Sequence, residues 1–220
     1  MKEKVVLGLS GGLDSSTVLA HLISQSKDVY CFIFLYGSKH NFYENQAAIK
    51  VAEYYDVSYK IIDLSDTFAG FKSNLLKTGG DIPEGHYTDE SMSQTVVPGR
   101  NIIFLSILAG YAWTIGASKI ALGIHQGDHA IYSDCRKEFY KAMDTAIYLG
   151  TDNRVEFIAP YIETDKAGIV KEGISLQVPY HLTRTCYTDQ PLACGKCGSC
   201  VERKEAFEKN NISDSILYKF

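Results

Sequence analysis

The sequence has no long run of apolar residues. A helix that crosses a membrane needs roughly 18 or more consecutive apolar residues, and no segment approaches that length. The first four residues, Met1-Lys2-Glu3-Lys4, also lack the apolar stretch that a secretory signal carries. We therefore expect no contact with a membrane, and we predict a cytoplasmic protein.

The sequence also has no excess of positive charge. It holds 22 Lys and Arg residues against 26 Asp and Glu residues, which gives a formal net charge of -4. Because affinity for a nucleic-acid backbone comes mainly from clustered Lys and Arg, we expect no stable binding of nucleic acid. In a cytoplasmic protein the six cysteines are reduced, so a cluster of cysteines points to a bound metal rather than to disulfides.

Short apolar segments alternate with helix-like segments along the chain. The short segments have the β-branched and aromatic content of strands, and they cover 5–10, 29–35, 59–64, 119–123 and 155–159. The helix-like segments cover 14–25, 42–55, 101–115, 135–149 and 164–173. This alternation predicts an α/β fold: a five-stranded parallel sheet with helices on both faces and ligands bound beyond the carboxyl ends of the strands. A chain of 220 residues suits one such unit with a small appendage.

Two further segments have two interpretations each. Residues 66–98 are polar and interrupted by Gly79-Gly80-Asp81-Ile82-Pro83, so they form either a mobile loop or lid near the site or a disordered insertion without a role. Residues 101–115 are apolar nearly all round, so this helix is buried either within the monomer or at a subunit contact.

The stretch SGGLDSS, Ser10 to Ser16, joins the first strand to the first helix. A glycine pair lets the backbone approach a ligand, and the following helix offers free N–H groups, a combination that cradles phosphate. The Lys of the GxxxxGK[ST] loop is missing, and the pattern is not GxGxxG. It resembles the pyrophosphate loop, SGGxDS, of the ATP pyrophosphatase group. The alternative is that Asp14 and Ser15 simply cap the helix.

Four cysteines stand close together near the end of the sequence. Their spacing, C-x7-C-x2-C-x2-C, lets four thiolates converge on one tetrahedral ion, which favours a structural Zn²⁺ site in front of a helix over 201–210; the residues are Cys186, Cys194, Cys197 and Cys200. An Fe–S cluster, a redox pair and a sulfur-carrying catalytic cysteine are the alternatives. Of the two remaining cysteines, Cys31 is expected in the core and Cys135 is ambiguous.

Three more clusters carry candidate site residues. The sequence VPGRN places Arg100, which can pair with phosphate or carboxylate, and Asn101 just before an apolar helix. The stretch from Gly123 to Phe139 follows the fourth strand, and its polar residues are placed to line a pocket: Asp128, His129, Tyr132, Asp134 and Arg136. Asp134 either caps the next helix or binds substrate, while His125 and His129 fit ordinary loop positions. Lys166, in a first helical turn, is either a site residue or a solvated lysine.

With these clusters assembled, the chain resembles the 7-cyano-7-deazaguanine synthase family of the queuosine pathway over nearly its whole length. The resemblance rests on SGGLDSS, Tyr36 to His40, VPGRN, the D-x-x-x-Y-x-D-C-R-x-E-F pattern ending at Phe139, the K-x-x-I-V of Lys166 to Val170, and TCY followed by the cysteine cluster and ERKEAF. It implies a Rossmann-like fold of the adenine nucleotide α-hydrolase type. It also implies an ATP pyrophosphatase (PP-loop) domain over residues 1–180 and a zinc-binding knuckle over residues 181–220 packed on it.

The resemblance also implies a reaction. The carboxylate of 7-carboxy-7-deazaguanine is activated by ATP as an acyl adenylate, ammonia displaces AMP to give the amide, and a second activation by ATP gives the nitrile. ATP, Mg²⁺ and Zn²⁺ are the implied cofactors, and a homodimer is the implied assembly.

The same resemblance assigns roles to individual residues. Asp14, Arg100 and Lys166 would be catalytic, with Asp14 helping to place Mg²⁺ and Asp134 accepting the N–H groups of the guanine-like edge. The nucleotide would be held by Leu9, Ser10, Gly11, Gly12, Leu13, Asp14, Ser15, Ser16 and Thr17. The deazaguanine would be held by Tyr36, Lys39, His40, Arg100, Asn101, Asp128, Tyr132, Asp134 and Arg136. The four clustered cysteines would bind zinc.

The chain departs from the family pattern at a few positions. Ser38 and Lys39 stand where the family often has Gln-Arg, Ser133 where it often has Pro, and Arg184 where it often has Trp. These departures leave open a variant that stops at the amide or passes the acyl group to another amine, for example on a protein acceptor. A tRNA-modifying enzyme with the same loop and a zinc-stabilised binding module without catalysis are two further alternatives.

Overall fold

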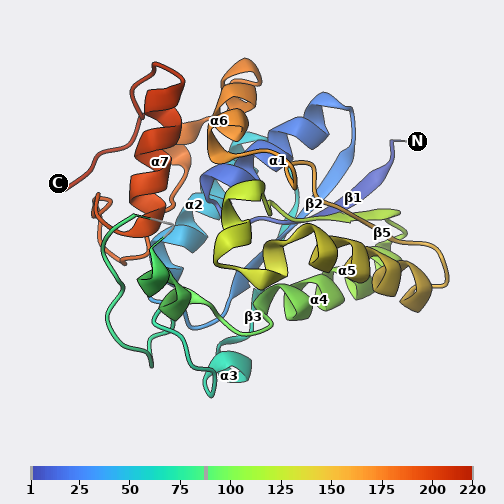
Figure 1. Cartoon of the computed structure of the whole chain (residues 1–220). Helices are drawn as coiled ribbons and strands as arrows, with labels where there is room; N and C mark the ends of the chain where they lie inside the picture. The colour runs from blue at the N-terminus through green and yellow to red at the C-terminus, as the bar shows by residue number, and fades with distance from the viewer. Residues whose placement is uncertain (1, 87–88, 220) are drawn as a thin grey trace.

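The computed structural model describes residues 2–86 and 89–219. Five strands form one parallel sheet in the order β3-β2-β1-β4-β5 (Figure 1). The strands are β1 (Lys4–Gly8), β2 (Asp28–Leu35), β3 (Tyr59–Asp63), β4 (Lys119–Ala121) and β5 (Glu156–Ile158). The predicted five-stranded parallel sheet is confirmed, and each strand lies within a few residues of its expected place.

The α-helices connect these strands and cover the sheet. They are α1 (Leu13–Ser24), α2 (Asn41–Tyr54), α3 (Ser65–Phe68), α4 (Arg100–Ile115), α5 (Lys137–Gly150), α6 (Lys166–Ser175) and α7 (Gly198–Lys209). Four short 3-10 helices cover Glu90–Thr95, Gln126–Ala130, Ser133–Cys135 and Tyr180–Leu182. The expected helix over 135–149 begins two residues later, because Arg136 has extended backbone angles that separate the turn before it from α5.

The two faces of the sheet carry separate apolar cores. Along β1, Val5 and Leu7 pack into one core and Val6 into the other, as the alternation of side chains along a strand requires. The first core includes side chains of α1, α2, α6 and α7, and the second includes side chains of α4 and α5. Figure 1 shows α4 and α5 on the side of the sheet opposite to α1 and α6. The prediction of helices on both faces is therefore confirmed.

The strand order reverses direction beside β1. The chain moves outward from β1 through β2 to β3, and then crosses back so that β4 pairs with the other side of β1. In a sheet of this kind the loops that leave neighbouring strands on either side of such a point diverge and leave a crevice for a ligand. Because the strands are parallel, the loops after β1, β2 and β4 all lie at the same edge of the sheet, around this point.

The loop after β1 passes very close to α2. Gly11 has a φ of +79°, a conformation that glycine adopts without a steric cost. A Cβ atom at position 11 would lie 2.3 Å from the backbone nitrogen of Ala48 and 2.8 Å from the carbonyl oxygen of Glu44. The backbone angle and the contact with α2 thus both require glycine at this position.

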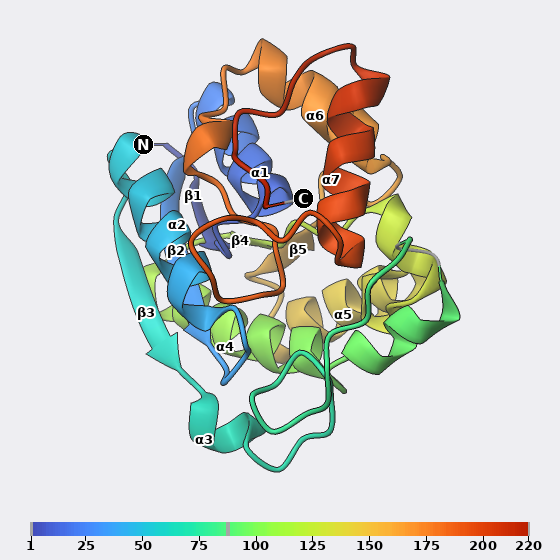
Figure 2. The same ribbon diagram turned by 90° about the vertical axis from the view of Figure 1, so that its left-hand side faces the viewer.

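The segment between α3 and α4 is folded where the structure describes it. Phe68, Leu75 and Leu76 are buried in a small cluster that also contains Phe104 of α4. Figure 2 shows the chain running from α3 toward α7 before it returns to α4, and the Gly85 amide donates to the Lys196 carbonyl at 3.2 Å. The expectation of a disordered insertion is wrong for the described part of 66–98; residues 87 and 88 lie outside the described residues.

The apolar helix α4 is buried on one side and exposed on the other. Phe104, Leu105 and Leu108 lie in the cores, whereas Ile102 is 47% and Trp113 43% exposed. Burial within the monomer therefore accounts for one side of this apolar helix and not for the other. Among the described residues, no helix combines the length and the apolar character that crossing a membrane requires.

Arg203 of α7 anchors the C-terminal segment. Its guanidinium is fully buried and donates to both carboxylate oxygens of Asp214, at 2.6 and 2.9 Å, and to Thr183 Oγ1 at 2.8 Å. The Asp214 side chain is 6% exposed and also accepts from the hydroxyl of Tyr218. A buried charge of this kind depends on its partner, because it cannot return to water in the folded state.

We expect Asp214→Ala to lower the free energy of unfolding by about 3–5 kcal/mol, because it leaves the Arg203 guanidinium buried without its counter-charge. Equilibrium unfolding in urea measures this loss. Glu208→Gln, at an exposed position of α7, the helix that carries Arg203, is the control and should change the value by about 0.5 kcal/mol or less. Equal losses in the two variants would contradict the importance of the pair.

Candidate active site

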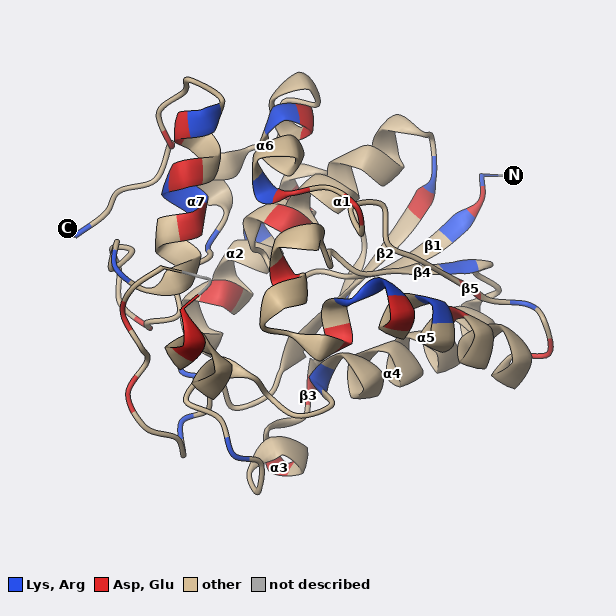
Figure 3. Ribbon diagram, viewed as in Figure 1, with Lys and Arg blue, Asp and Glu red and all other residues tan. Residues whose placement is uncertain are grey.

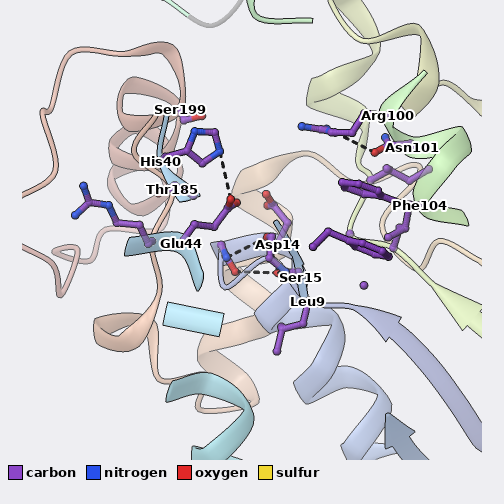
Figure 4. Close-up of a pocket in the computed structure, with 18 of the residues that line it drawn as sticks. Leu9, Asp14, Ser15, His40, Glu44, Arg100, Asn101, Phe104, Thr185 and Ser199 are labelled. Atoms are coloured by element: carbon purple, nitrogen blue, oxygen red, sulfur yellow. Dashed lines mark hydrogen bonds and ion pairs between the residues drawn. The ribbon is translucent and has the colours of Figure 1, made fainter. Parts of the chain in front are cut away.

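A cavity lies beyond the carboxyl ends of β1, β2 and β4. Its walls come from the loops after these strands, from the first turns of α1, α2 and α4, from Lys166 of α6 and from residues 184–187. Figure 4 shows how the labelled side chains enter it from several elements. They are Leu9, Asp14, Ser15, His40, Glu44, Arg100, Asn101, Phe104, Thr185 and Ser199. The cavity thus collects residues from most of the motifs that the sequence singled out.

The loop after β1 is held by its own serines. Ser15 Oγ lies 3.2 Å from the Ser10 amide and 3.0 Å from Ser10 Oγ, and the Gly12 amide donates to Ser10 Oγ. Gly12 is the N-cap of α1 and no side chain caps this helix. The alternative in which Asp14 and Ser15 serve as helix caps is therefore wrong. The uncapped N-terminus of α1 keeps the N–H groups and positive dipole end that suit an anion.

Four residues of the expected nucleotide-binding run do not line the cavity. Leu13 is buried in the core, and Gly11 faces α2. The Ser16 hydroxyl donates to the Gly12 carbonyl at 2.7 Å, and the Thr17 hydroxyl donates to the Leu13 carbonyl at 2.8 Å. Both side chains turn back onto α1 because small hydroxyl groups readily bond to the preceding helical turn. Leu9, Ser10, Gly12, Asp14 and Ser15 do line it.

Asp14 faces a buried cationic partner. One carboxylate oxygen, Oδ2, lies 3.2 Å from Lys166 Nζ and 3.9 Å from His125 Nε2. Burial opposes the charge on Lys166, but the carboxylates of Asp14 and Glu202 hold the pKa of its ammonium above the ordinary value. The other oxygen of Asp14, Oδ1, is buried and makes no hydrogen bond. An unpaired carboxylate oxygen beside the loop fits a divalent cation of the Mg²⁺ type.

Arg100 and Asn101 enter the opposite wall from the start of α4. Burial alone would lower the pKa of Arg100, but Tyr36 and Asp134 keep it above the usual value. The Asp134 carboxylate accepts from the Asn101 amide at 3.2 Å, and Asn101 Nδ2 donates to the Asp134 carbonyl at 3.1 Å. Asp134 therefore does not cap the next helix, α5, as one interpretation expected. It bonds to the start of α4, because α5 begins only after the extended Arg136.

The loop after β2 contributes a buried histidine, and the first turn of α2 contributes a carboxylate. His40 Nε2 lies 3.3 Å from Glu44 Oε2 on the next turn of α2 and 3.3 Å from the Tyr36 hydroxyl. Burial raises the pKa of Tyr36 to about 12, so this hydroxyl is neutral near pH 7. Glu44 is a cavity residue that the sequence did not suggest; its spacing of four residues from His40 was the available signal.

Three of the expected substrate residues, Lys39, Asp134 and Arg136, do not line the cavity. The Lys39 ammonium donates to the carbonyls of Gly79 and Gly80, and the exposed Arg136 donates to the His129 carbonyl at 2.9 Å. Both side chains bind neighbouring loops, because backbone carbonyls that have no partner within a helix or sheet need another hydrogen-bond donor.

Tyr132 connects the cavity to the segment before α4. Its hydroxyl is 2.7 Å from Thr95 Oγ1 and 3.3 Å from the Tyr187 hydroxyl. Tyr187 and His125 are two more cavity-side residues that the sequence did not single out as site residues. His125 is 1% exposed, and its Nδ1 accepts from the Gly127 amide, so its Nε2 points toward Asp14 and Asp128.

The four clustered cysteines converge beside this cavity. Their sulfur atoms all lie within 4.8 Å of one another, a separation that suits four thiolate ligands around one tetrahedral ion. The other two cysteines lie apart: Cys31 is buried in the core, and Cys135 forms part of the cavity wall. None of the six forms a disulfide.

The Arg184 side chain binds the loop that carries these cysteines. Its guanidinium donates to the carbonyls of Thr188, Gln190 and Pro191. Its backbone amide donates to the Gly11 carbonyl at 2.8 Å. The guanidinium of Arg184, which stands where the family often has Trp, is therefore bound to carbonyls of the cysteine-bearing loop rather than free in the cavity.

The sequence is similar to known proteins over nearly the whole chain. The family model described as "Queuosine biosynthesis protein QueC" matches residues 4–211. A 7-cyano-7-deazaguanine synthase of Caldicellulosiruptor bescii is 46% identical over 217 residues, which cover 98% of this chain and 97% of that protein. The synthase of Pseudoalteromonas translucida is 43% identical over the full length of both chains.

Solved structures support the fold at much lower sequence similarity. A structure of NMN synthetase from Francisella tularensis is 16% identical, has a TM-score of 0.53, and covers 96% of this chain and 79% of its own. A predicted subunit of a tRNA methyltransferase from Methanocaldococcus jannaschii is 12% identical with a TM-score of 0.51, and covers 96% and 90%. At these identities the likeness concerns the fold alone.

Proposed function

Since the chain belongs to the QueC family of queuosine biosynthesis proteins, we propose that it is an ATP-dependent carbon–nitrogen ligase that converts 7-carboxy-7-deazaguanine and ammonia to 7-cyano-7-deazaguanine. The observation that carries this proposal is one cavity beyond the carboxyl ends of β1, β2 and β4. It combines the SGGLDSS loop with Asp14, Arg100 and Lys166. The full-length similarity to curated synthases supports the same substrate class.

The first half of the reaction makes an amide. A carboxylate oxygen of the substrate attacks the α-phosphorus of ATP, and pyrophosphate leaves. Ammonia then attacks the acyl carbon, AMP leaves with the former carboxylate oxygen, and the nitrogen gives up one proton. A carboxylate oxygen is a poor leaving group and AMP a good one, so the protein chiefly positions anionic reactants and offsets their repulsion.

The second half makes the nitrile from the amide. The amide oxygen attacks the α-phosphorus of a second ATP, and pyrophosphate leaves again. Departure of AMP then breaks the remaining carbon–oxygen bond, and the nitrogen loses its two protons to form the carbon–nitrogen triple bond. Both halves use one type of phosphorus chemistry, so a single nucleotide site serves both.

We assign the phosphates to the wall formed by α1 and α6. Ser10, Gly12 and Ser15 would hold the leaving pyrophosphate at the N-terminus of α1. Lys166 and Arg100 would offset the negative charge that the two reactants bring together. Mg²⁺, where bound by Asp14 Oδ1, would neutralise further phosphate charge.

We assign the deazaguanine to the wall formed by the loops after β2 and β4 and by the start of α4. The side chains that would contact it are Tyr36, His40, Asn101, Asp128 and Tyr132. Asp134 does not line the cavity, and its carboxylate accepts a hydrogen bond from the Asn101 backbone. Its direct contact with the guanine-like edge stays a prediction of the family resemblance.

We propose zinc as the ion of the cysteine cluster, because four sulfur ligands complete its tetrahedral coordination and leave no position for substrate. Residues 1–180 would form the ATP-binding unit, with residues 181–220 packed on it; Ala206 and Phe207 in the same core as β1 support this arrangement. A cytoplasmic location would keep these thiols reduced.

The alternatives have less support. The guanidinium of Arg184 is occupied by three carbonyls, which removes the reason to expect an altered acyl acceptor or a protein conjugate. The synthase name of full-length relatives also disfavours a product that stops at the amide. A tRNA-modifying role would need a basic surface, whereas Figure 3 shows acidic and basic residues interspersed along α5 and α7.

Incubation of the protein with 7-carboxy-7-deazaguanine, ATP, Mg²⁺ and ammonium tests the proposed reaction. We expect the nitrile, with about two AMP and two pyrophosphate for each product, because each activation consumes one ATP. Mass spectrometry follows amide, nitrile and AMP together. Accumulation of the amide without nitrile would contradict the second half of the reaction.

The cysteine cluster predicts about one zinc ion per chain and almost none in Cys197→Ser. We expect this loss to lower the Tm by about 10 °C or more, because metal binding contributes directly to folding. Elemental analysis and thermal unfolding measure the two effects. Cys31→Ala is the control and should retain its zinc; iron with inorganic sulfide in place of zinc would instead indicate an Fe–S cluster.

We propose a homodimer that uses the exposed side of α4. Figure 3 shows no charged residue on α4 after Arg100, and the outer side presents Ile102 and Trp113. Tyr148 and Leu149, at the end of the neighbouring α5, are 40% and 67% exposed. An apolar surface of this kind on a water-exposed helix is typical of a protein interface.

Trp113→Glu should weaken the dimer by about 30-fold or more, because it places a charge in the middle of an apolar contact. Sedimentation velocity over a range of concentrations measures the association. Lys209→Glu, at the exposed end of α7, is the control and should leave it unchanged. A wild-type protein that stays monomeric at high concentration would overturn the proposal.

A further inference from the structure

We infer that Glu202 is a positioning residue that holds the Lys166 ammonium toward the pyrophosphate loop, and that it thereby links the cysteine cluster to the ATP site. The inference rests on the proposed function, in which Lys166 contacts the phosphates of ATP. Glu202 lies behind Lys166 rather than in the cavity wall, so it acts through the lysine.

The ammonium of Lys166 lies between two carboxylates. Its Nζ atom is 2.7 Å from Glu202 Oε2 and 3.2 Å from Asp14 Oδ2. The three side chains are 7%, 13% and 19% exposed for Lys166, Glu202 and Asp14. At these distances and this degree of burial the interactions are little screened by water. Glu202 thus sets one of the directions in which the ammonium is pulled, beside Asp14 and the weaker attraction of Asp128.

Lys166 approaches this position from the first turn of α6. Asp165 caps that helix, and its Oδ1 accepts from the Gly168 amide at 2.8 Å. α6 packs against both α1 and α7, and Figures 1 and 2 agree that α6 and α7 lie side by side. The lysine therefore extends from a fixed backbone into the space between the pyrophosphate loop and α7.

The residues on both sides of Glu202 in α7 are anchored. Cys197 is the N-cap of α7 and Cys200 lies in its first turn, so a metal bound by the cysteines would fix the start of the helix. The next residue after Glu202 is Arg203, which is fully buried against Asp214. Glu202 lies between these two anchors. A displacement of the residues that carry the four cysteines would therefore move its carboxylate.

The loop after β4 limits the remaining freedom of Glu202. A Cβ atom at Gly127 would lie 2.7 Å from Glu202 Oε1, so this loop packs against the oxygen that does not face Lys166. The carboxylate is therefore confined on one side by the β4 loop and on the other by the ammonium. Such confinement is what a group needs in order to orient a partner side chain.

The charge balance explains why a second carboxylate is useful here. With Asp14 alone, the ammonium would be drawn onto the same carboxylate that we propose to meet Mg²⁺. Glu202 offers it a competing anchor, which leaves Asp14 available to a cation while the lysine stays near the phosphates. Substitution of Glu202 by a neutral side chain should therefore impair the use of ATP more than the binding of the deazaguanine.

The test compares three variants with the wild-type protein. Glu202→Gln keeps the shape and removes the charge, Glu202→Asp keeps the charge on a shorter side chain, and Glu208→Gln makes the same change at an exposed position of α7. The readouts are kcat and KM for ATP and for 7-carboxy-7-deazaguanine, the affinity for magnesium pyrophosphate by calorimetry, the zinc content and the Tm.

We expect Glu202→Gln to lower kcat/KM for ATP by about 10- to 100-fold and to weaken magnesium pyrophosphate binding by about tenfold. The KM for the deazaguanine should stay within about twofold, with zinc content and Tm near the wild-type values. Glu202→Asp should recover at least part of the loss because it restores the charge, and Glu208→Gln should match the wild-type protein.

Two results would overturn the inference. One is an unchanged affinity for magnesium pyrophosphate in Glu202→Gln; the other is a loss of zinc and Tm that accompanies equal losses for both substrates, which indicates a structural role alone. If the wild-type protein makes no AMP, the proposed function fails. The comparison of pyrophosphate binding between wild type and Glu202→Gln still decides the inference in that case.

Discussion

The close approach of the loop after β1 to the backbone of α2 is the constraint on which the site depends. Gly11 has no room for a side chain beside Ala48, and its carbonyl accepts a hydrogen bond from the Arg184 amide. One residue therefore joins the first strand, the second helix and the C-terminal segment. Because its φ is also positive, the chain can turn there and present the start of α1 to the cavity.

Local patterns in the sequence predicted the sheet, most helices and the pyrophosphate loop, because strand and helix periodicity and the glycine pair are properties of neighbouring residues. The same patterns did not indicate the direction of individual side chains. Lys39 and Arg136 stand within motifs of the site, yet both turn away to hold loop carbonyls. Asp134 does not cap α5, which was one of its two expected roles, and its carboxylate accepts from the backbone amide of Asn101 at the start of α4.

Contacts between distant residues explain the remaining differences. Lys166 and Glu202 are separated by 36 residues, and no spacing rule connects them; they meet because α6 and α7 pack together. The short 3-10 helices and α3 were missed for a related reason. Their segments are too short to show a period, and Phe68 of α3 is buried in a cluster with the distant Phe104.

The placement of Arg184 and Glu202 late in the chain has a consequence for the nascent protein. All five strands precede both residues, so the strands and the loop after β1 are synthesised before either partner. Until then Gly11 lacks the donor from Arg184, and Lys166 lacks one of its two carboxylates. A chain that ends before α7 would lack the Glu202 carboxylate that faces Lys166, and it would also lack the Ala206 and Phe207 side chains of the first core.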